Sequence, residues 1–257
     1  ALKLTLKDVK IDVSDTGDGA TSGKAALSVQ GKGNVEIELD GKNELKSGYR
    51  RAGLEKNTSE GTLTLKDDNK DGSLKATGGD FGAGIGGGYK GNGKNITIKG
   101  GTVNAAGGDN GGAGIGGGDY GSGEDITITG GTVNAAGGLD GAGIGGGWKG
   151  SGKNITITGG TVNAAGGNGG SGIGGGDYGS GEDITIKGGT VNAAGGYGGA
   201  GIGGGYEGSG SNVTVSGAAQ VTAITGKPDW VGAGATIGNG GNETGGQPVD
   251  GDELQAD

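Results

Sequence analysis

The sequence predicts an all-β protein, a single-stranded right-handed parallel β-helix (a solenoid) of about eight coils of 27–35 residues. Three observations predict this fold. A Gly-rich segment recurs five times at steps of 29 or 30 residues, two further apolar segments follow it at constant distances, and apolar and polar residues alternate within the segments. Alternation with period 2 is typical of strands. Right-handed winding is expected from the general preference of β crossovers.

Each repeat holds three short segments: AGIGGG or a variant, ITI followed by Lys or Thr, and TVNAA. Gly-Gly and Gly-X-Gly turns separate them and supply positive φ at sharp corners. Hairpins within a coil would not require equal coil lengths, whereas in a solenoid each strand pairs with its equivalent in the next coil. We therefore expect one interior ladder of five side chains: Ile85, Ile115, Ile144, Ile173 and Ile202.

The repeats organise residues 1–240 as one β-helix, with divergent coils over 1–80 and regular coils of 29–30 residues over 81–216. Residues 241–257 are expected to form a polar C-terminal tail. Coils about 4.8 Å apart predict a rod roughly 40 Å long. The apolar marks that count the eight coils are Leu27, Leu54, Ile85, Ile115, Ile144, Ile173, Ile202 and Ile237.

The composition excludes several classes of function. Gly is 76 of 257 residues, but Pro is only 2 and no triplet period occurs, which rules out collagen. The net charge of −9 without a basic stripe disfavours nucleic acid, and no apolar run is long enough for membrane insertion. Because Cys and His are both 0, thiol nucleophiles, Ser-His-Asp triads and Cys/His zinc sites are removed. We expect no enzyme; the lack of Cys fits a reducing cytosol or an exported bacterial surface protein.

One aromatic residue per regular coil follows the Ile of the Gly-rich segment, so a solenoid would place these rings in one file. Such rings can hold the apolar faces of sugars. The alternative is that they only cap Gly-rich corners by stacking on each other. We keep both interpretations for the five glycan-binding candidates: Tyr89, Tyr120, Trp148, Tyr178 and Tyr206.

A candidate calcium site lies in the segment Asp-Asp-Asn-Lys-Asp-Gly at residues 67–72. Alternating side-chain oxygens before a Gly turn can wrap Ca²⁺, and the candidate ligands are Asp67, Asn69 and Asp71. The same segment also reads as an Asn/Asp/Gly turn that needs no metal. No other cofactor is expected.

Repeated polar residues predict further columns along the rod. Lys94, Glu124, Lys153 and Glu182 alternate in sign, as do Lys90, Asp119, Lys149 and Asp177, and opposite charges on neighbouring strands would specify register. The column of Asn104, Asn134, Asn163 and Asn192 is expected to stack its amides. An outward Thr column raises ice binding as a minor alternative, although Lys99 and Lys187 interrupt the column beside it.

The pattern GAGIGGG, then ITI, then GGTVNAAGG resembles the Gly-rich β-helix repeats of secreted and wall-associated proteins of Gram-positive, clostridia-like bacteria. The resemblance covers roughly residues 25–240. It implies a carbohydrate-binding relationship and bound calcium, and the lack of Arg in the regular coils favours binding without cleavage. We expect a secreted or cell-surface bacterial module that binds a polysaccharide, such as a host or cell-wall glycan, or acts as an adhesin, and that is monomeric. A rigid stalk or spacer without a ligand is the alternative.

Overall fold

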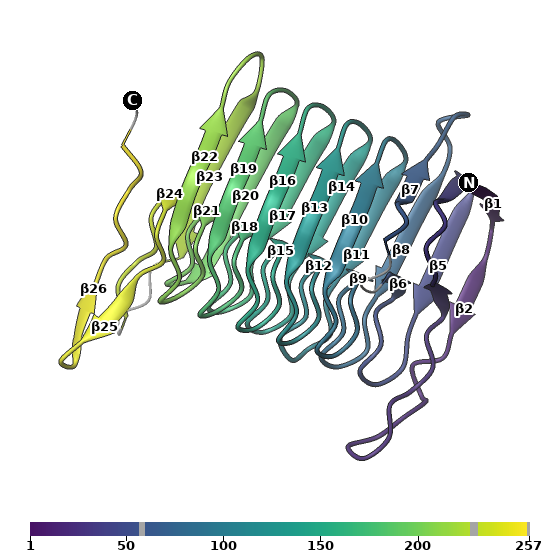
Figure 1. Cartoon of the computed structure of the whole chain (residues 1–257), viewed down its shortest axis with the longest axis horizontal. Helices are drawn as coiled ribbons and strands as arrows, with labels where there is room; N and C mark the ends of the chain where they lie inside the picture. The colour runs from purple at the N-terminus through teal and green to yellow at the C-terminus, as the bar shows by residue number, and fades with distance from the viewer. Residues whose placement is uncertain (57–59, 227–230, 256–257) are drawn as a thin grey trace.

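The computed structural model describes residues 1–56, 60–226 and 231–255, and it confirms the solenoid. These residues form strands and no helix, and three parallel sheets of eight strands run along one rod (Figure 1). Sheet A holds the GKNITI-type segments: β1 (Leu2–Lys7), β4 (Val35–Asp40), β7 (Leu63–Lys66), β10 (Gly93–Ile98), β13 (Gly123–Ile128), β16 (Gly152–Ile157), β19 (Gly181–Ile186) and β22 (Gly210–Val215).

Sheet B holds the TVNAA segments, and sheet C holds the two- or three-residue strands of the Gly-rich segments. The strands of sheet B are β2 (Lys10–Asp12), β5 (Lys42–Lys46), β8 (Ser73–Thr77), β11 (Thr102–Ala106), β14 (Thr132–Ala136), β17 (Thr161–Ala165), β20 (Thr190–Tyr197) and β23 (Gln220–Gly226). Those of sheet C are β3 (Leu27–Val29), β6 (Leu54–Lys56), β9 (Ile85–Gly86), β12 (Ile115–Gly116), β15 (Ile144–Gly145), β18 (Ile173–Gly174), β21 (Ile202–Gly203) and β24 (Ile237–Gly238).

The winding is right-handed. In Figure 1 the nearer strands run upward, the strands behind them run downward, and successive coils advance from right to left. Every strand of sheets A, B and C pairs in parallel with its equivalent one coil away, without a register slip among the regular coils from β10 to β19. Among the described strands, the pairing of β20 with β23 shifts register between Ala194 and Tyr197.

The core is a set of ladders, because the same inward position carries an apolar residue in every coil. The five predicted Ile residues of sheet C, from Ile85 to Ile202, are fully buried, and Ile144 pairs with Ile115 on one side and Ile173 on the other. Further ladders come from the inward positions of sheets A and B, such as Ile155 and Val162, which are also fully buried. The predicted interior ladder is therefore confirmed.

Glycine is required at the second residue of each regular strand of sheet C. Gly145 has φ +135°, and a Cβ placed there would lie 1.9 Å from the carbonyl oxygen of Gly174 in the next coil. Gly86, Gly116 and Gly174 have the same conformation and an equally close approach. Both the backbone conformation and the space exclude a side chain at this corner, which explains why GIGGG recurs.

A second special position precedes the ITI segment. Its residues have φ between 50° and 57°, and they are Asn or Asp in all five regular coils, the types that tolerate this region best. Asn and Asp also alternate between coils, so Asn154 donates a hydrogen bond to Asp125 (2.6 Å) and Asn212 donates to Asp183 (2.6 Å). The position therefore turns the chain and joins neighbouring coils.

The C-terminal segment folds back on the last coil. Residues beyond 240 form the antiparallel hairpin of β25 (Asn242–Thr244) and β26 (Gln247–Val249), and then cross the open edge of sheet C. There Glu253 accepts hydrogen bonds from the backbone N–H groups of Thr236 (2.6 Å) and Ile237 (3.0 Å). The segment expected as a polar tail thus covers the end strand of sheet C, and an open edge is where strands otherwise invite further pairing.

Candidate functional site

The five rings of the predicted file lie on one edge of the rod and occupy two alternating positions. Tyr89, Trp148 and Tyr206 stand four residues after the Ile of sheet C and are half-buried. Tyr120 and Tyr178 stand five residues after it, have left-handed backbones (φ +60° and +61°), and are 45% and 47% exposed. We call this set the aromatic edge. The coils of Tyr120 and Tyr178 therefore expose a ring to solvent, whereas the coils of Tyr89, Trp148 and Tyr206 keep theirs half-buried.

The rings contact each other edge to face rather than forming a flat platform. Trp148 contacts Tyr120 with ring centres 4.6 Å apart at 74°, and Tyr178 contacts Tyr206 at 5.6 Å and 78°. Tyr120 also contacts Tyr89, with ring centres 6.3 Å apart. Tyr89 contacts Phe81, and Phe81 contacts Tyr49. The sequence did not predict this extension into the divergent coils. Edge-to-face packing fixes ring orientation and contributes about 0.5–1.5 kcal/mol per pair.

Three cationic side chains lie over the ring faces. Arg50 lies between Tyr49 (5.0 Å) and Tyr89 (4.8 Å). Lys90 lies between Tyr89 (5.2 Å) and Tyr120 (5.7 Å). Lys149 lies 4.4 Å from the centre of the Trp148 ring and 5.8 Å from that of Tyr178. Cations and rings therefore alternate along this edge, and each cation stabilises the rings on both sides.

Aspartates lie beneath the aromatic edge. Asp119 and Asp177 take the position that holds Tyr89, Trp148 or Tyr206 in the other coils, and Asp119 is only 4% exposed. Burial, followed by the charge of Asp140, raises the pKa of Asp119 to about 6 and that of Asp177 to about 7. A hydrogen bond from Trp148 opposes part of the shift at Asp177.

No acidic cluster was expected from the sequence, because these three aspartates come from two different loop positions in neighbouring coils. The structure brings Asp119, Asp140 and Asp177 close enough for the charge of Asp140 to act on both others. The sequence signal that could have indicated the buried aspartates is the alternation of Asp with an aromatic residue at the fourth position after the Ile of the Gly-rich segment. Perturbed carboxyl groups accompany many functional sites, but burial beneath packed rings produces the same shift.

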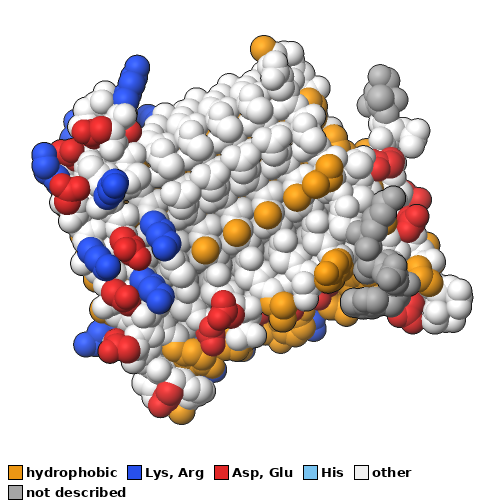
Figure 2. Space-filling view, turned by 180° about the vertical axis from the view of Figure 1, so that it is seen from behind, with side chains coloured by type: hydrophobic (Ala, Val, Ile, Leu, Met, Phe, Trp, Pro, Cys, Tyr) orange, Lys and Arg blue, Asp and Glu red, His pale blue; other side chains and the backbone are white. Residues whose placement is uncertain are grey.

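Sheet B carries the second notable surface, a groove of about 520 Å³ that follows the rod. Figure 2 shows charged side chains gathered at the N-terminal end of this face and a line of hydrophobic side chains crossing an uncharged region. The groove is lined by the outward Asn column and by a column of Ala methyl groups, and Lys75 is its one charged lining residue among the described residues. The Ala column consists of Ala106, Ala136, Ala165 and Ala194 and continues into Ile224, which is 57% exposed.

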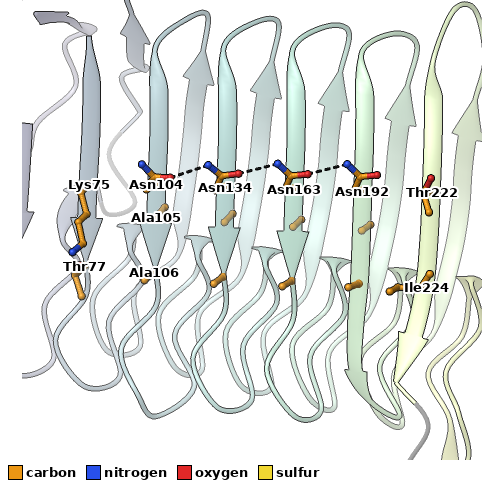
Figure 3. Close-up of a pocket in the computed structure, with 16 residues that line it drawn as sticks. Lys75, Thr77, Asn104, Ala105, Ala106, Asn134, Asn163, Asn192, Thr222 and Ile224 are labelled. Carbon is orange, nitrogen blue, oxygen red and sulfur yellow. Dashed lines mark hydrogen bonds between the residues drawn. The ribbon is translucent and has the colours of Figure 1, made fainter. Parts of the chain in front are cut away.

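The Asn column stacks its amides, as predicted (Figure 3). Asn134 donates to the side-chain oxygen of Asn104 (2.8 Å), Asn163 to that of Asn134 (2.8 Å), and Asn192 to that of Asn163 (2.9 Å). Each donating amide uses one of its two N–H groups in the ladder, and the ladder does not use the second N–H group.

Of the two predicted charge rows, the row before the ITI segments forms ion pairs. Lys94 lies 3.4 Å from Glu124, and Lys153 lies 3.9 Å from Glu182. The row after the Gly-rich segment is arranged differently: its lysines lie over rings, its aspartates are packed below them, and no ion pair joins the two within the described ranges. Charge alternation in that row therefore accompanies ring packing.

The candidate calcium loop connects β7 and β8 and adopts a compact turn. Asp67 accepts a hydrogen bond from the backbone N–H of Gly72 (3.1 Å), Lys70 has φ +64°, and Asp68 pairs with Lys66. Asn69 and Asp71 are exposed. No group of three or more His, Cys, Asp or Glu side chains suited to a metal occurs in the part of the chain that the structure describes. The turn interpretation accounts for these contacts.

The fold and these repeated columns define a parallel β-solenoid. A family model described as beta helix repeat matches residues 70–89, 96–119, 126–148, 155–177 and 184–206. The first match begins in the loop between β7 and β8, the other four begin in sheet A, and all five end in the loop that carries the aromatic edge. The matched segments are therefore similar to β-helix repeats, in agreement with the parallel solenoid that they help to form. No curated protein and no solved structure matches it. The described residues contain no helix long and apolar enough to cross a membrane.

Proposed function

We propose that this domain is a non-catalytic, extracellular bacterial module, monomeric in itself, that binds a polysaccharide along its aromatic edge, as an adhesin or glycan-binding domain does. The observation that carries the proposal is the exposure of Tyr120 and Tyr178 on alternate coils. Two coils correspond to about 9.6 Å. Rings at that spacing could contact successive units of an extended glycan, and their neighbours hold them rigidly.

The half-buried rings take a supporting role in this proposal. Trp148 contacts Tyr120, lies under Lys149 and donates a hydrogen bond to Asp177, so its substitution would disturb the whole edge. The contact residues are then Tyr120 and Tyr178, and Tyr89, Trp148 and Tyr206 orient them. Each exposed ring would contribute on the order of 1 kcal/mol, which gives affinities in the micromolar to millimolar range when several contacts act together.

A second candidate function is a rigid stalk without a ligand of its own. The edge-to-face packing of the rings and the cations over their faces favour it, because ring faces already covered by the protein are less available to sugars. In that case the aromatic edge stiffens the Gly-rich loops and has no partner outside the chain.

The test is a Tyr120→Ala/Tyr178→Ala double variant in affinity electrophoresis through gels that contain neutral or acidic polysaccharides, with and without a calcium chelator. Val215→Ala is the control, because Val215 is 43% exposed and lies in β22 of sheet A, away from the aromatic edge. We expect the double variant to lose at least tenfold in affinity and the control to bind as the parent does. Equal binding by the double variant would remove the aromatic edge as the contact surface, and a parent that binds no polysaccharide would favour the stalk. Retardation abolished by the chelator would instead assign calcium a role.

A further inference from the structure

The groove on sheet B lies on a different surface from the aromatic edge and has the shape of a linear site. Its lining extends from Lys75 and Thr77 in β8 to Thr222 and Ile224 in β23, which is a distance of five coils, or about 24 Å. Figure 3 shows the repeated side chains of this lining facing the same way in successive coils. A ligand that fills it must therefore be elongated and must follow the rod axis.

The lining repeats the same chemistry in each regular coil. Every coil contributes an Asn amide and an Ala methyl group to the groove at equivalent positions, as the pairing of Asn134 with Asn163 and of Ala136 with Ala165 shows. An array of identical subsites about 4.8 Å apart suits a polymer of identical units better than a peptide of varied sequence. The period of the protein thus indicates a repetitive ligand.

The groove is also polar on one side and apolar on the other. Asn134 and Asn163 each retain one amide N–H that the ladder does not use, while Ala136 and Ala165 offer exposed methyl groups. Sugar rings present hydroxyl groups at their edges and C–H groups on their faces, so an extended glycan can meet both sides. Between Lys75 and Ile224 the lining carries no charge, which favours a neutral chain.

We propose that this groove binds a neutral, extended polysaccharide that runs along the rod across the Asn and Ala columns. The proposal rests on the proposed function and adds a second contact surface to it.

The experiment replaces two Ala residues in the middle of the groove by residues with larger side chains. Ala136→Leu/Ala165→Leu fills it without charge, and Ala136→Lys/Ala165→Lys fills it with positive charge. The fold accepts Lys in this column, because Ala106 pairs with Thr77, and Thr77 pairs with Lys46. The matched control is Thr129→Lys/Thr158→Lys, directly after strands β13 and β16 of sheet A, in the column that already holds Lys99 and Lys187. Thermal unfolding checks that all variants remain folded.

Binding is measured by affinity electrophoresis and titration with soluble β-1,4-glucan, β-1,3-glucan, mannan and xylan. We expect the parent to bind at least one of these neutral polymers, both groove variants to lose at least tenfold in affinity, and the control to stay within twofold. Groove variants that bind as the parent does would overturn this inference and leave the aromatic edge standing. A parent that binds none of these neutral polymers would overturn the inference. The proposal for the aromatic edge would then depend on whether the parent binds the acidic polysaccharides.

Two other outcomes also contradict the inference. Stronger binding by the Lys variant, or binding of anionic polymers alone, would show that the ligand is not neutral. A parent dimer in sedimentation velocity that the Leu variant dissociates would identify a second copy of the chain as the occupant of the groove.

Discussion

Lys149 places its amine 4.4 Å from the centre of the Trp148 ring, and the same amine lies 5.8 Å from the ring of Tyr178. The rings of the aromatic edge form two groups, and no ring contact joins Trp148 to Tyr178. Lys149 also lies 6.0 Å from the centre of the Tyr120 ring, so this one cation interacts with rings on both sides of the break between Trp148 and Tyr178.

We expect Lys149→Met to lower the free energy of unfolding by about 0.5–1 kcal/mol, because the cation–π contacts are lost while the aliphatic stem is kept. Urea unfolding measures the change. Trp148 fluorescence, recorded in a Trp230→Phe background, should report the altered ring environment. Lys187→Met is the control, since Lys187 is exposed and has no ion pair in the described parts of the chain. Equal effects of the two substitutions would contradict a special role for Lys149.

The interior ladder gives the largest expected effect. Ile144→Asp should cost several kcal/mol, because it buries an unpaired carboxylate between Ile115 and Ile173. Ile144→Val should cost only about 0.5–1.5 kcal/mol, since it removes one methylene from the same place. Urea midpoints compare the two. A folded Ile144→Asp variant with the midpoint of the parent would show that this position is not interior.

The buried aspartates should make stability depend on pH. The pKa values of Asp119, about 6, and Asp177, about 7, lie above the ordinary value of 3.8, so the folded state binds more protons than the unfolded state. The free energy of unfolding should be highest when both are protonated, fall as the pH rises from about 4 to 7, and then level off.

Asp177→Asn removes this ionisation and keeps an acceptor for Trp148. We expect it to raise stability at pH 8 relative to the parent and to flatten the decline between pH 4 and 7. Asp109→Asn, at an exposed aspartate of a Gly-rich loop, is the control. Unfolding by urea at several pH values gives both curves. A parent that gains stability from pH 4 to 7 would reverse the expected sign and contradict the buried-acid arrangement.

The Asn ladder predicts a difference between an interior member and an end member. Asn163 donates to Asn134 and accepts from Asn192, whereas Asn104 takes part in one ladder bond. With about 1 kcal/mol per hydrogen bond, Asn163→Ala should cost roughly twice as much as Asn104→Ala. Both are outward-facing residues of sheet B with the same change in volume, so each serves as the control for the other. Equal costs in chemical denaturation would mean that the ladder adds little.

Ion pairs between coils predict a charge-swap rescue. Lys94→Glu places like charges beside Glu124 and Asp125 and should destabilise the fold by less than about 1 kcal/mol at low salt. The double variant Lys94→Glu/Glu124→Lys should recover most of the loss. In 1 M salt the differences should shrink, because exposed charges are screened. Failure of the swap to restore stability would argue that the alternation does not contribute to register.

The period of 29 or 30 residues was sufficient to predict the regular coils and the interior Ile ladder, and the less regular apolar marks at Leu27, Leu54 and Ile237 completed the count of about eight coils. A parallel solenoid converts equal spacing along the chain into stacking in space, so Ile144 had to lie between Ile115 and Ile173 once the coils were aligned. The same reasoning predicted the Asn ladder and the ion pairs before the ITI segments. The left-handed backbone at positions such as Asn154 was not predicted, although it explains why Asn or Asp stands there.

The columns follow from the amino-acid sequence alone, because residues at equal positions in successive coils must become neighbours. How closely side chains of different columns approach one another, and how deeply each is buried, depends on the folded loops. A one-residue shift within the loop directs Tyr120 outward and leaves Asp119 beneath the rings, and the fold of the Gly-rich corners brings Asp140 close to both Asp119 and Asp177. Such neighbours depend on loop conformation and on packing between coils, and a linear repeat does not encode these distances.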